Sequence, residues 1–404
     1  MNSYFLPKII KFSVVFLFFI GGCAPALSIR GSENAQPPKI IITPEIELTD
    51  IPTNKRFKVA IDDKGLAHVL VPVPEKGELY HLVVDEGGIL EKEVVMKSDY
   101  LDRLDIASDK EGNLYAIVDY DHLVLREGKW QTLTKLPDRC KWFALSGKNI
   151  VCAYELKGEE VGAPDRWDWY WGGLGGIFGI IPLHTHAQKI VITIGNEAGW
   201  SNKFILDSAE ELDEYLSSVS TDDEGAIHIM YRSSVSGNFI QHAAMGDVRY
   251  ARIDPSMINE SSGNTDLRKV EGLRISWEEP LSFAIDSKTG ILLLASWDKN
   301  SRSYKTCTIK YPSLERDLET NFFSGGTISK IYFLSMGDDE FQALVDGHYF
   351  NYINNVWSAP IELTGMKATG KTEFVSDRSG GALVIWQKEN KRLAGQWIKP
   401  IREH

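Results

Sequence analysis

The chemistry that the sequence indicates most clearly lies in its first residues. Lys8 and Lys11 give a positive start, and residues 12–20 form an apolar run. This run is far short of the roughly 20 apolar residues that cross a bilayer as a helix, so it is typical of a cleaved signal segment. The small glycines at 21–22 leave the next peptide bond open to a peptidase. The Cys23 thiol that follows them can form a thioether with a lipid.

This order of features, ending in Ile20-Gly21-Gly22-Cys23, resembles the lipobox of bacterial lipoproteins. The resemblance implies a signal peptide over residues 1–22 and a diacylglycerol on Cys23, which anchors the mature chain to a membrane. Ala24 stands where an aspartate often retains lipoproteins in the inner membrane, so the resemblance implies the outer membrane in a cell that has one. Residues 23–38 are expected to form a flexible tether after the lipidated cysteine. The alternative is an ordinary secretory signal with an incidental cysteine.

Three cysteines follow Cys23, at positions 140, 152 and 307. Cys140 and Cys152 flank a predicted hairpin turn over residues 146–149, so they could lie opposite each other on neighbouring strands. In an exported protein this arrangement allows a disulfide. Two buried thiols are the alternative.

The chain is acidic, with 44 Lys and Arg against 56 Asp and Glu and a net charge of −12. Loss of residues 1–22 removes two lysines and no acid, so the mature chain is more acidic still. This charge argues against nucleic acid as a partner, because phosphate binding needs a basic face. The motifs GxSxG and HExxH are absent, which weakens the serine hydrolase and metalloprotease interpretations.

A short pattern recurs along the mature chain: an apolar strand, an Asp-rich turn ending in Gly, and a second apolar strand. The aspartate can accept hydrogen bonds from the backbone ahead of it, and the glycine supplies the positive φ that closes the turn. The clearest turns span residues 62–65, 109–112, 222–225, 286–290 and 377–380, and weaker copies lie at Gly147 and Gly337.

Turn glycines recur at intervals of about 45 residues, and Trp130, Trp200 and Trp357 each open a further strand. Four strands in each of seven units predict an all-β fold, a seven-bladed β-propeller of four-stranded antiparallel blades over residues 39–404. The final unit lacks an outer strand, whereas residues 41–49 resemble residues 360–364. We therefore predict that an N-terminal strand pairs into the last blade and closes the ring.

The pattern resembles the Asp-box repeats of the sialidase-like propeller superfamily. The best copy is Thr221-Asp222-Asp223-Glu224-Gly225, with His228 three residues after the glycine. Most copies carry one more residue between Asp and Gly, and His or Tyr stands where the family usually has Trp. The resemblance implies the fold, and it implies that a site would lie on the face opposite the Asp turns.

One unit is longer than the others, because an insertion of about residues 158–188 separates its second and third strands. This insertion is rich in glycine and aromatic residues, including Trp167, Trp169, Tyr170 and Trp171. It would emerge on the face opposite the Asp turns as a protrusion that contacts a partner, a ligand or a membrane. The alternative is a plug over the propeller mouth. Its two histidines lack a third ligand, so no metal or other cofactor is expected.

The ends of the second strands would surround the same face. They supply further candidates for ligand binding, which are Tyr120, Tyr231, Arg232, Trp297, Asp298 and Trp386. Aromatic faces beside polar groups suit a sugar or a peptide. The alternative is that these aromatic side chains pack between adjacent blades.

Two functions are compatible with these features. The first is a membrane-anchored envelope protein that binds a protein, peptide or glycan partner, and the second is a glycan-active hydrolase or lyase. A sialidase needs an arginine cluster, a Tyr/Glu pair and an acidic general acid. The arginines of this sequence are scattered and match no such motif, so we favour binding over catalysis.

Overall fold

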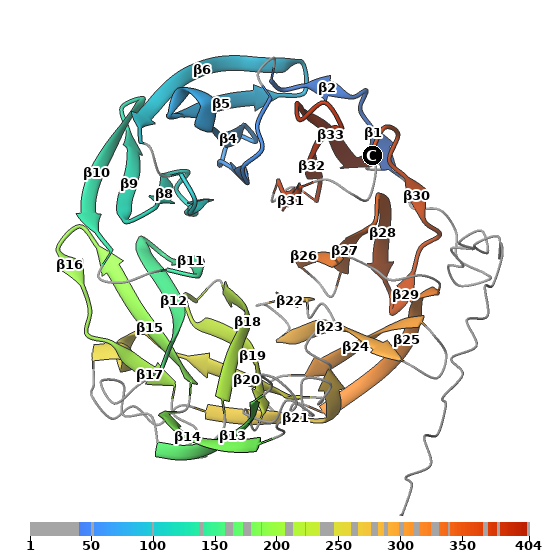
Figure 1. The fold of residues 1–404 in the computed structure, drawn as a ribbon. Coiled ribbons are helices and arrows are strands. Elements are labelled where there is room, and N and C mark those ends of the chain that lie inside the picture. The colour runs from blue at the N-terminus through green and yellow to red at the C-terminus, as the bar shows by residue number, and fades with distance from the viewer. Residues whose placement is uncertain are drawn as a thin grey trace, which may run out of the picture.

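A computed structural model of the chain forms a ring of small antiparallel sheets around a central axis (Figure 1). The structure describes residues 40–49, 52–98, 101–136, 140–157, 165–172, 179–186, 188–206, 213–222, 224–234, 246–259, 266–275, 282–286, 290–298, 303–310, 315–324, 331–337, 340–366, 371–377 and 380–401. Seven of the sheets are blades, which confirms the predicted seven-bladed propeller. Within these ranges, no helix has the length and apolar character needed to cross a bilayer.

The first four blades run in chain order around the ring. Blade 1 contains β3 (Lys58–Ile61), β4 (Ala67–Val73), β5 (Glu78–Asp85) and β6 (Gly88–Lys97), with the 3-10 helix η1 (Pro74–Lys76) between β4 and β5. Blade 2 contains β7 (Leu104–Ser108), β8 (Leu114–Val118), β9 (Asp121–Arg126) and β10 (Lys129–Lys135). Blade 3 contains β11 (Trp142–Ser146), β12 (Asn149–Lys157), β15 (Gln188–Asn196), β16 (Gly199–Trp200) and β17 (Phe204–Leu206). Blade 4 contains β18 (Asp213–Thr221), β19 (Ile227–Ser234), β20 (Gly246–Ile253) and β21 (Asp266–Ile275), with the 3-10 helix η4 (Pro255–Asn259) after β20.

The remaining three blades complete the circle. Blade 5 contains β22 (Ser282–Asp286), β23 (Ile291–Asp298), β24 (Ser303–Lys310) and β25 (Glu315–Ser324). Blade 6 contains β26 (Ile331–Gly337), β27 (Glu340–Val345), β28 (His348–Ile353), β29 (Val356–Trp357) and β30 (Ile361–Glu362). Blade 7 contains β31 (Thr372–Ser376), β32 (Ala382–Gln387), β33 (Leu393–Pro400) and the two N-terminal strands β1 (Ile40–Ile42) and β2 (Ile46–Glu47).

The N-terminal segment closes the ring, as predicted. Strand β1 pairs antiparallel with β33, with Ile40 opposite Pro400, and β2 continues along the same strand with Ile46 opposite Gly395. Leu48, directly after β2, is fully buried in the apolar cluster between blades 7 and 1. Blade 7 therefore takes its outer strand from the beginning of the chain.

The Asp turns join the first and second strands of their blades and have the predicted hydrogen bonds. In blade 1, Asp62 Oδ1 accepts the backbone N–H groups of Lys64 at 2.9 Å and Leu66 at 2.8 Å. The Asp109 and Asp222 carboxylates accept the equivalent two bonds in blades 2 and 4. Gly65 has a φ of +80°, which permits the turn at no steric cost. The local sequence therefore dictates how each blade begins.

Apolar cores fill the spaces between neighbouring blades, and there is one cluster at each of the seven junctions. Every residue of β4 and of β8 is buried, because alternate side chains enter the junctions on either side of the strand. Burial of a large aliphatic side chain contributes roughly 1.5–3 kcal/mol. The blades thus hold one another in place.

Ring closure can be tested with two substitutions in the same segment. Replacing the buried Leu48 with Ala should lower the free energy of unfolding by about 2–5 kcal/mol, because it opens a cavity at the junction of blades 7 and 1. Replacing Ile41, which is 56% exposed, with Ala should change it by no more than ~0.5 kcal/mol. Urea unfolding of both variants measures the difference, and equal effects would contradict the described closure.

Candidate functional site

The face opposite the Asp turns carries the insertion and the starts of the inner strands. Because consecutive strands are antiparallel, connections between second and third strands emerge there. The insertion lies between the second and third strands of blade 3, β12 and β15. This segment therefore leaves the propeller on the face opposite the Asp turns.

Within the insertion, β13 (Asp165–Gly172) and β14 (Gly179–His186) form an antiparallel hairpin. Trp167 lies opposite His184, Trp169 opposite Pro182 and Trp171 opposite Ile180. The two strands pair with each other and with no blade (Figure 1). Alternate positions of a strand share one face, so this register assigns the three tryptophans to the same face of the ribbon.

Four of the predicted ligand-binding residues, Trp167, Trp169, Tyr170 and Trp171, belong to β13. Their side chains lie outside the described part of the structure, as do those of Trp297 and Asp298 at the end of β23. The backbone of the latter two pairs with that of Tyr304 and Ser303 in β24.

The other predicted ligand-binding residues divide between surface and core. Tyr120 is 46% exposed in the turn between β8 and β9. Tyr231 is buried between blades 3 and 4, and Trp386 between blades 6 and 7. Arg232, beside Tyr231, is only 8% exposed. The packing alternative therefore describes Tyr231 and Trp386, since the second strand of a blade is covered on both sides.

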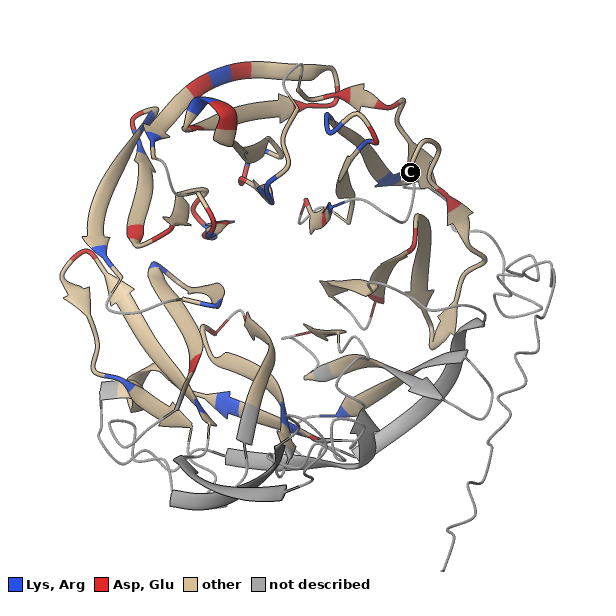
Figure 2. Ribbon diagram, viewed as in Figure 1, with Lys and Arg blue, Asp and Glu red and all other residues tan. Residues whose placement is uncertain are grey.

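A charged group occupies the start of the inner strands. Lys58 of β3 lies between carboxylates of both neighbouring blades, with Nζ 3.8 Å from Asp105 of β7 and 3.4 Å from Glu373 of β31. The Asp105 carboxylate is the main cause of a raised Lys58 pKa, and burial raises the pKa of Asp105. Figure 2 shows positive and negative segments side by side around the centre of the ring. The three side chains tie blades 7, 1 and 2 together at the mouth.

Further cations lie beside this group. Lys55 forms an ion pair with Asp102, and Lys371 Nζ donates a hydrogen bond to the backbone oxygen of Asn54. Burial lowers the pKa of Lys371, and the nearby charges of Arg56 and Lys55 lower it further. Arg56 itself is exposed and forms no ion pair with any residue in the described ranges. The sequence analysis missed this cluster, because its members come from distant parts of the chain.

Residues 365–372 also fit the phosphate-binding pattern GxxxxGK[ST], which the sequence analysis overlooked. A phosphate-binding loop of that kind leads into a helix whose N-terminus holds the phosphate. Here Thr372 begins the strand β31 instead. The pattern therefore lacks the structural context of a nucleotide site, and what it contributes to the mouth is Lys371.

In the described part of the chain, the mouth does not bring together the groups that a sialidase needs. Tyr332 and Glu373 lie near each other, but the Tyr332 hydroxyl donates to the Thr372 backbone oxygen at 2.7 Å. Burial raises the Tyr332 pKa and the Glu373 charge raises it further, which opposes the phenolate that a nucleophile requires. Arg103 donates to the Cys140 backbone oxygen at 3.4 Å instead of joining Arg56.

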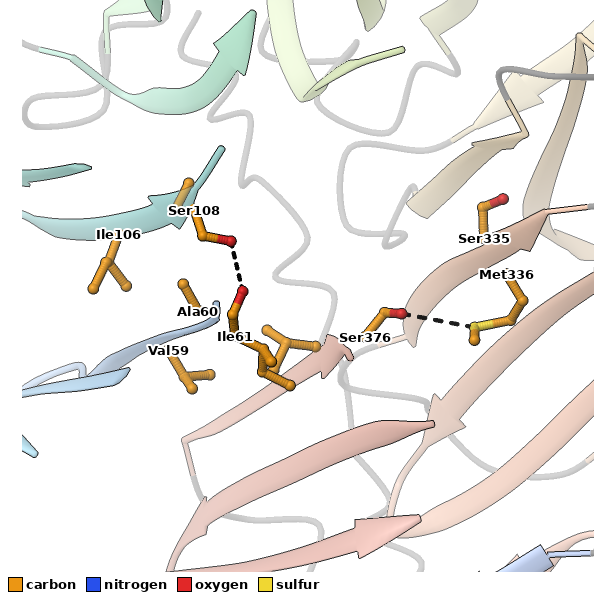
Figure 3. Close-up of a pocket in the computed structure, with 10 residues that line it drawn as sticks. Val59, Ala60, Ile61, Ile106, Ser108, Ser335, Met336 and Ser376 are labelled. Carbon is orange, nitrogen blue, oxygen red and sulfur yellow. Dashed lines mark hydrogen bonds between the residues drawn. The ribbon is translucent and has the colours of Figure 1, made fainter. Parts of the chain in front are cut away.

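A cavity of about 390 Å³ lies at the other end of the channel, beside the Asp turns (Figure 3). Its lining is aliphatic with a few hydroxyls, and comes from Val59, Ala60, Ile61, Ile106, Ala107, Ser108, Ser335, Met336, Val375 and Ser376. The Ser108 hydroxyl donates to the Ile61 backbone oxygen at 2.5 Å. Among the described residues, no charged side chain lines this cavity, so they supply it with no acid, base or anion-binding group.

Histidines form buried polar chains inside the blades. In blade 1, His68 Nε2 lies 3.2 Å from Asp62 Oδ2, His68 Nδ1 lies 2.9 Å from His81 Nε2, and His81 Nδ1 lies 2.9 Å from Glu93. His228 joins Asp222 to Tyr250 in blade 4 in the same way. Among the described residues, no three His, Cys, Asp or Glu side chains are arranged to hold a metal ion. These chains hold the carboxylates of the turn aspartates from inside the blades.

Cys140 and Cys152 are joined in a disulfide, with their Cα atoms 5.3 Å apart. This separation lies within the range of protein disulfides. Both residues belong to the cluster between blades 2 and 3, and Cys307 is a buried cysteine in blade 5 outside this disulfide.

Comparisons with known proteins give no family for this chain. No family model and no curated protein matches it. It is similar to the extracellular domain of a one-component system from B. thetaiotaomicron, at 11% identity and a TM-score of 0.47, over 86% of this chain and only 39% of that chain. It is also similar to a gluconolactonase from Xanthomonas campestris (10% identity, TM-score 0.40, 93% and 98% of the two chains). A third is hydrazine synthase from Kuenenia stuttgartiensis (9%, 0.42, 76% and 83%). At these values the propeller rests on its own strand pairing, and no activity follows.

Buried histidines should make the fold sensitive to acid. Burial lowers the pKa of His122 to about 4, whereas an unfolded chain titrates near 6.5. Between these pH values the unfolded state binds a proton that the folded state excludes, so stability falls as the pH drops through this window. The slope is up to about 1.4 kcal/mol per pH unit. Urea unfolding from pH 7 to pH 4.5 should show a shallower loss for His122→Phe than for the unaltered protein. Parallel curves would contradict the assignment.

Proposed function

We propose that this chain is a membrane-anchored envelope lipoprotein, attached through Cys23, whose propeller binds a protein, peptide or glycan partner through the face opposite the Asp turns. The observation that carries the proposal is the β13–β14 hairpin on that face. Among the three classes of partner, the hairpin favours a protein.

An isolated two-stranded hairpin is at best marginally stable in water. This one places Trp167, Trp169 and Trp171 at alternate positions, opposite His184, Pro182 and Ile180. Each tryptophan can bury about 150–250 Å² of surface. Tryptophan is also among the residues that dominate the energetics of protein interfaces. A partner that covers this face would therefore stabilise the hairpin as it binds.

The direction of the first strand supports the assignment of this face. Ile40 lies opposite Pro400, and Pro400 Cγ lies 3.5 Å from the position of a Cβ added to Gly380, in the last Asp turn. The chain between Cys23 and Ile40 therefore enters the ring at the Asp-turn face. A flexible tether of this length extends on the order of 22 Å. The hairpin then points away from the membrane that holds the anchor.

The disulfide supports export. Cys140 and Cys152 are bonded in the structure, and disulfides persist in oxidising compartments outside the cytosol. The alternative of a glycan-active hydrolase or lyase has less support, because Tyr332 is engaged by the backbone of Thr372 and its pKa is raised.

The role of the hairpin can be tested by comparing its two faces. Replacing Trp167, Trp169 and Trp171 with Ser should reduce crosslinking of a partner in intact envelopes at least tenfold, because these residues share one face. The matched control replaces residues 166 and 168, at the intervening positions, with Ser and should retain capture. Equal capture by both variants, or a large fall in melting temperature for the first one alone, would indicate a plug that packs on the propeller.

Anchoring gives a separate prediction. Metabolic labelling with an alkyne fatty acid should modify the unaltered protein, and Cys23→Ala should abolish the label and move the protein to the soluble fraction, because no other thiol follows the signal directly. Cys307→Ala, which removes a buried thiol, is the control and should keep the label. Labelling that persists in Cys23→Ala would rule out this anchor.

A further inference from the structure

Arg56 lies at the junction of blades 7 and 1, on the same face as the hairpin, and its exposed guanidinium has no ion-pair partner in the described ranges. Three lysines lie near it. Lys371 and Lys58 are close enough for the Arg56 charge to lower their pKa values, and Lys55 precedes it directly. Like charges held together raise the free energy of the folded state, so a compensating anion at this point would be stabilising.

The backbone around Arg56 is fixed on both sides. Thr53 is buried, donates its hydroxyl to the Pro72 backbone oxygen at 2.6 Å, and receives a hydrogen bond from Gln387. Phe57, on the other side, is 1% exposed in the cluster between blades 7 and 1. Residues 54–56 lie between these two anchors, so the backbone of Arg56 is held at a defined place at the mouth. This lowers the ordering cost of binding.

The charge balance of this cluster favours an anion with a single negative charge. Among the described residues of this cluster there are four cations and three carboxylates: Lys55 pairs with Asp102, Lys58 lies beside Asp105 and Glu373, and neither Arg56 nor Lys371 forms an ion pair within the described ranges. One positive charge remains in an otherwise acidic protein. A single carboxylate neutralises it, whereas a phosphate dianion or a polyanionic glycan would bring excess negative charge beside the three acids. A guanidinium also binds a carboxylate through two parallel hydrogen bonds.

We infer that Arg56, with Lys371 beside it, is a docking point for one aspartate or glutamate side chain of a protein partner. This inference rests on the proposed function, because it assigns a chemistry to the partner that the hairpin face binds. The contact would be partly exposed at the rim of the mouth, so it would contribute more to selectivity and association rate than to total affinity. Binding through it should weaken as the salt concentration rises.

A random peptide library displayed on phage tests the inference without a known partner. Selection on the soluble domain, residues 39–404, should enrich Asp and Glu at one position of the recovered peptides. Selection on Arg56→Glu should lose that enrichment and favour Lys or Arg at the same position. The matched control is Lys64→Glu, which makes the same change of charge on an exposed residue of the Asp-turn face, and it should keep the acidic preference.

Three results would overturn the inference, and a fourth would separate it from the proposed function. Recovery of the same acidic peptides by Arg56→Glu, or of peptides without acidic enrichment by the unaltered domain, would overturn the inference. So would binding of a uronic acid oligosaccharide in place of any peptide. If partner crosslinking in envelopes needs Trp167, Trp169 and Trp171 but is unchanged in Arg56→Glu, the docking point fails while the proposed function stands.

Discussion

Each blade of this propeller is buried on both faces, and the ring depends on that burial. A second strand such as β32 carries five buried residues in succession, and they alternate between the two neighbouring junctions. No blade could keep these side chains from water alone, so all seven must assemble together. An open ring would expose one complete junction, which includes Phe57, Leu48 and Trp397. This is why the first residues of the propeller complete its last blade.

The fold was predictable because its strongest signals are local. An Asp turn is specified within five residues, since Asp62 accepts the backbone N–H groups of Lys64 and Leu66. The recurrence of such turns predicted seven units, and the echo of residues 360–364 near the start predicted the closing strand. His68, Tyr115 and His228 occupy equivalent positions, three residues after the turn glycines at 65, 112 and 225. The two histidines bond the turn aspartates and continue into polar chains inside the blade.

The site was less predictable, because its residues meet only in three dimensions. Lys58 and Asp105 belong to neighbouring blades and Glu373 lies near the other end of the chain, and each looks in the sequence like an ordinary charged residue at the start of a strand. Aromatic residues at the ends of second strands gave an ambiguous signal, since the same residue type suits a ligand and a junction. Tyr231 and Trp386 are buried in junctions. The alternation of Trp167, Trp169 and Trp171 is a sequence signal for the paired hairpin of the insertion. The glycine-rich segment that follows makes this signal less apparent.

The entry of the first strand and the insertion lie on opposite faces of the ring. Consecutive strands of a blade run in opposite directions. Because β1 is antiparallel to β33, it begins at the end where β33 finishes, which is the Asp-turn face. The same alternation sends the connection between β12 and β15 to the other face. A longer insertion there would leave the junctions and the entry of β1 unchanged. An insertion in an Asp turn would break the hydrogen bonds between the aspartate and the backbone of the turn. The position of the hairpin thus follows from a connection on the face opposite both the entry of β1 and the hydrogen bonds of the Asp turns. If the chain is anchored through Cys23 as proposed, a propeller built in this way would present the β13–β14 hairpin away from its membrane.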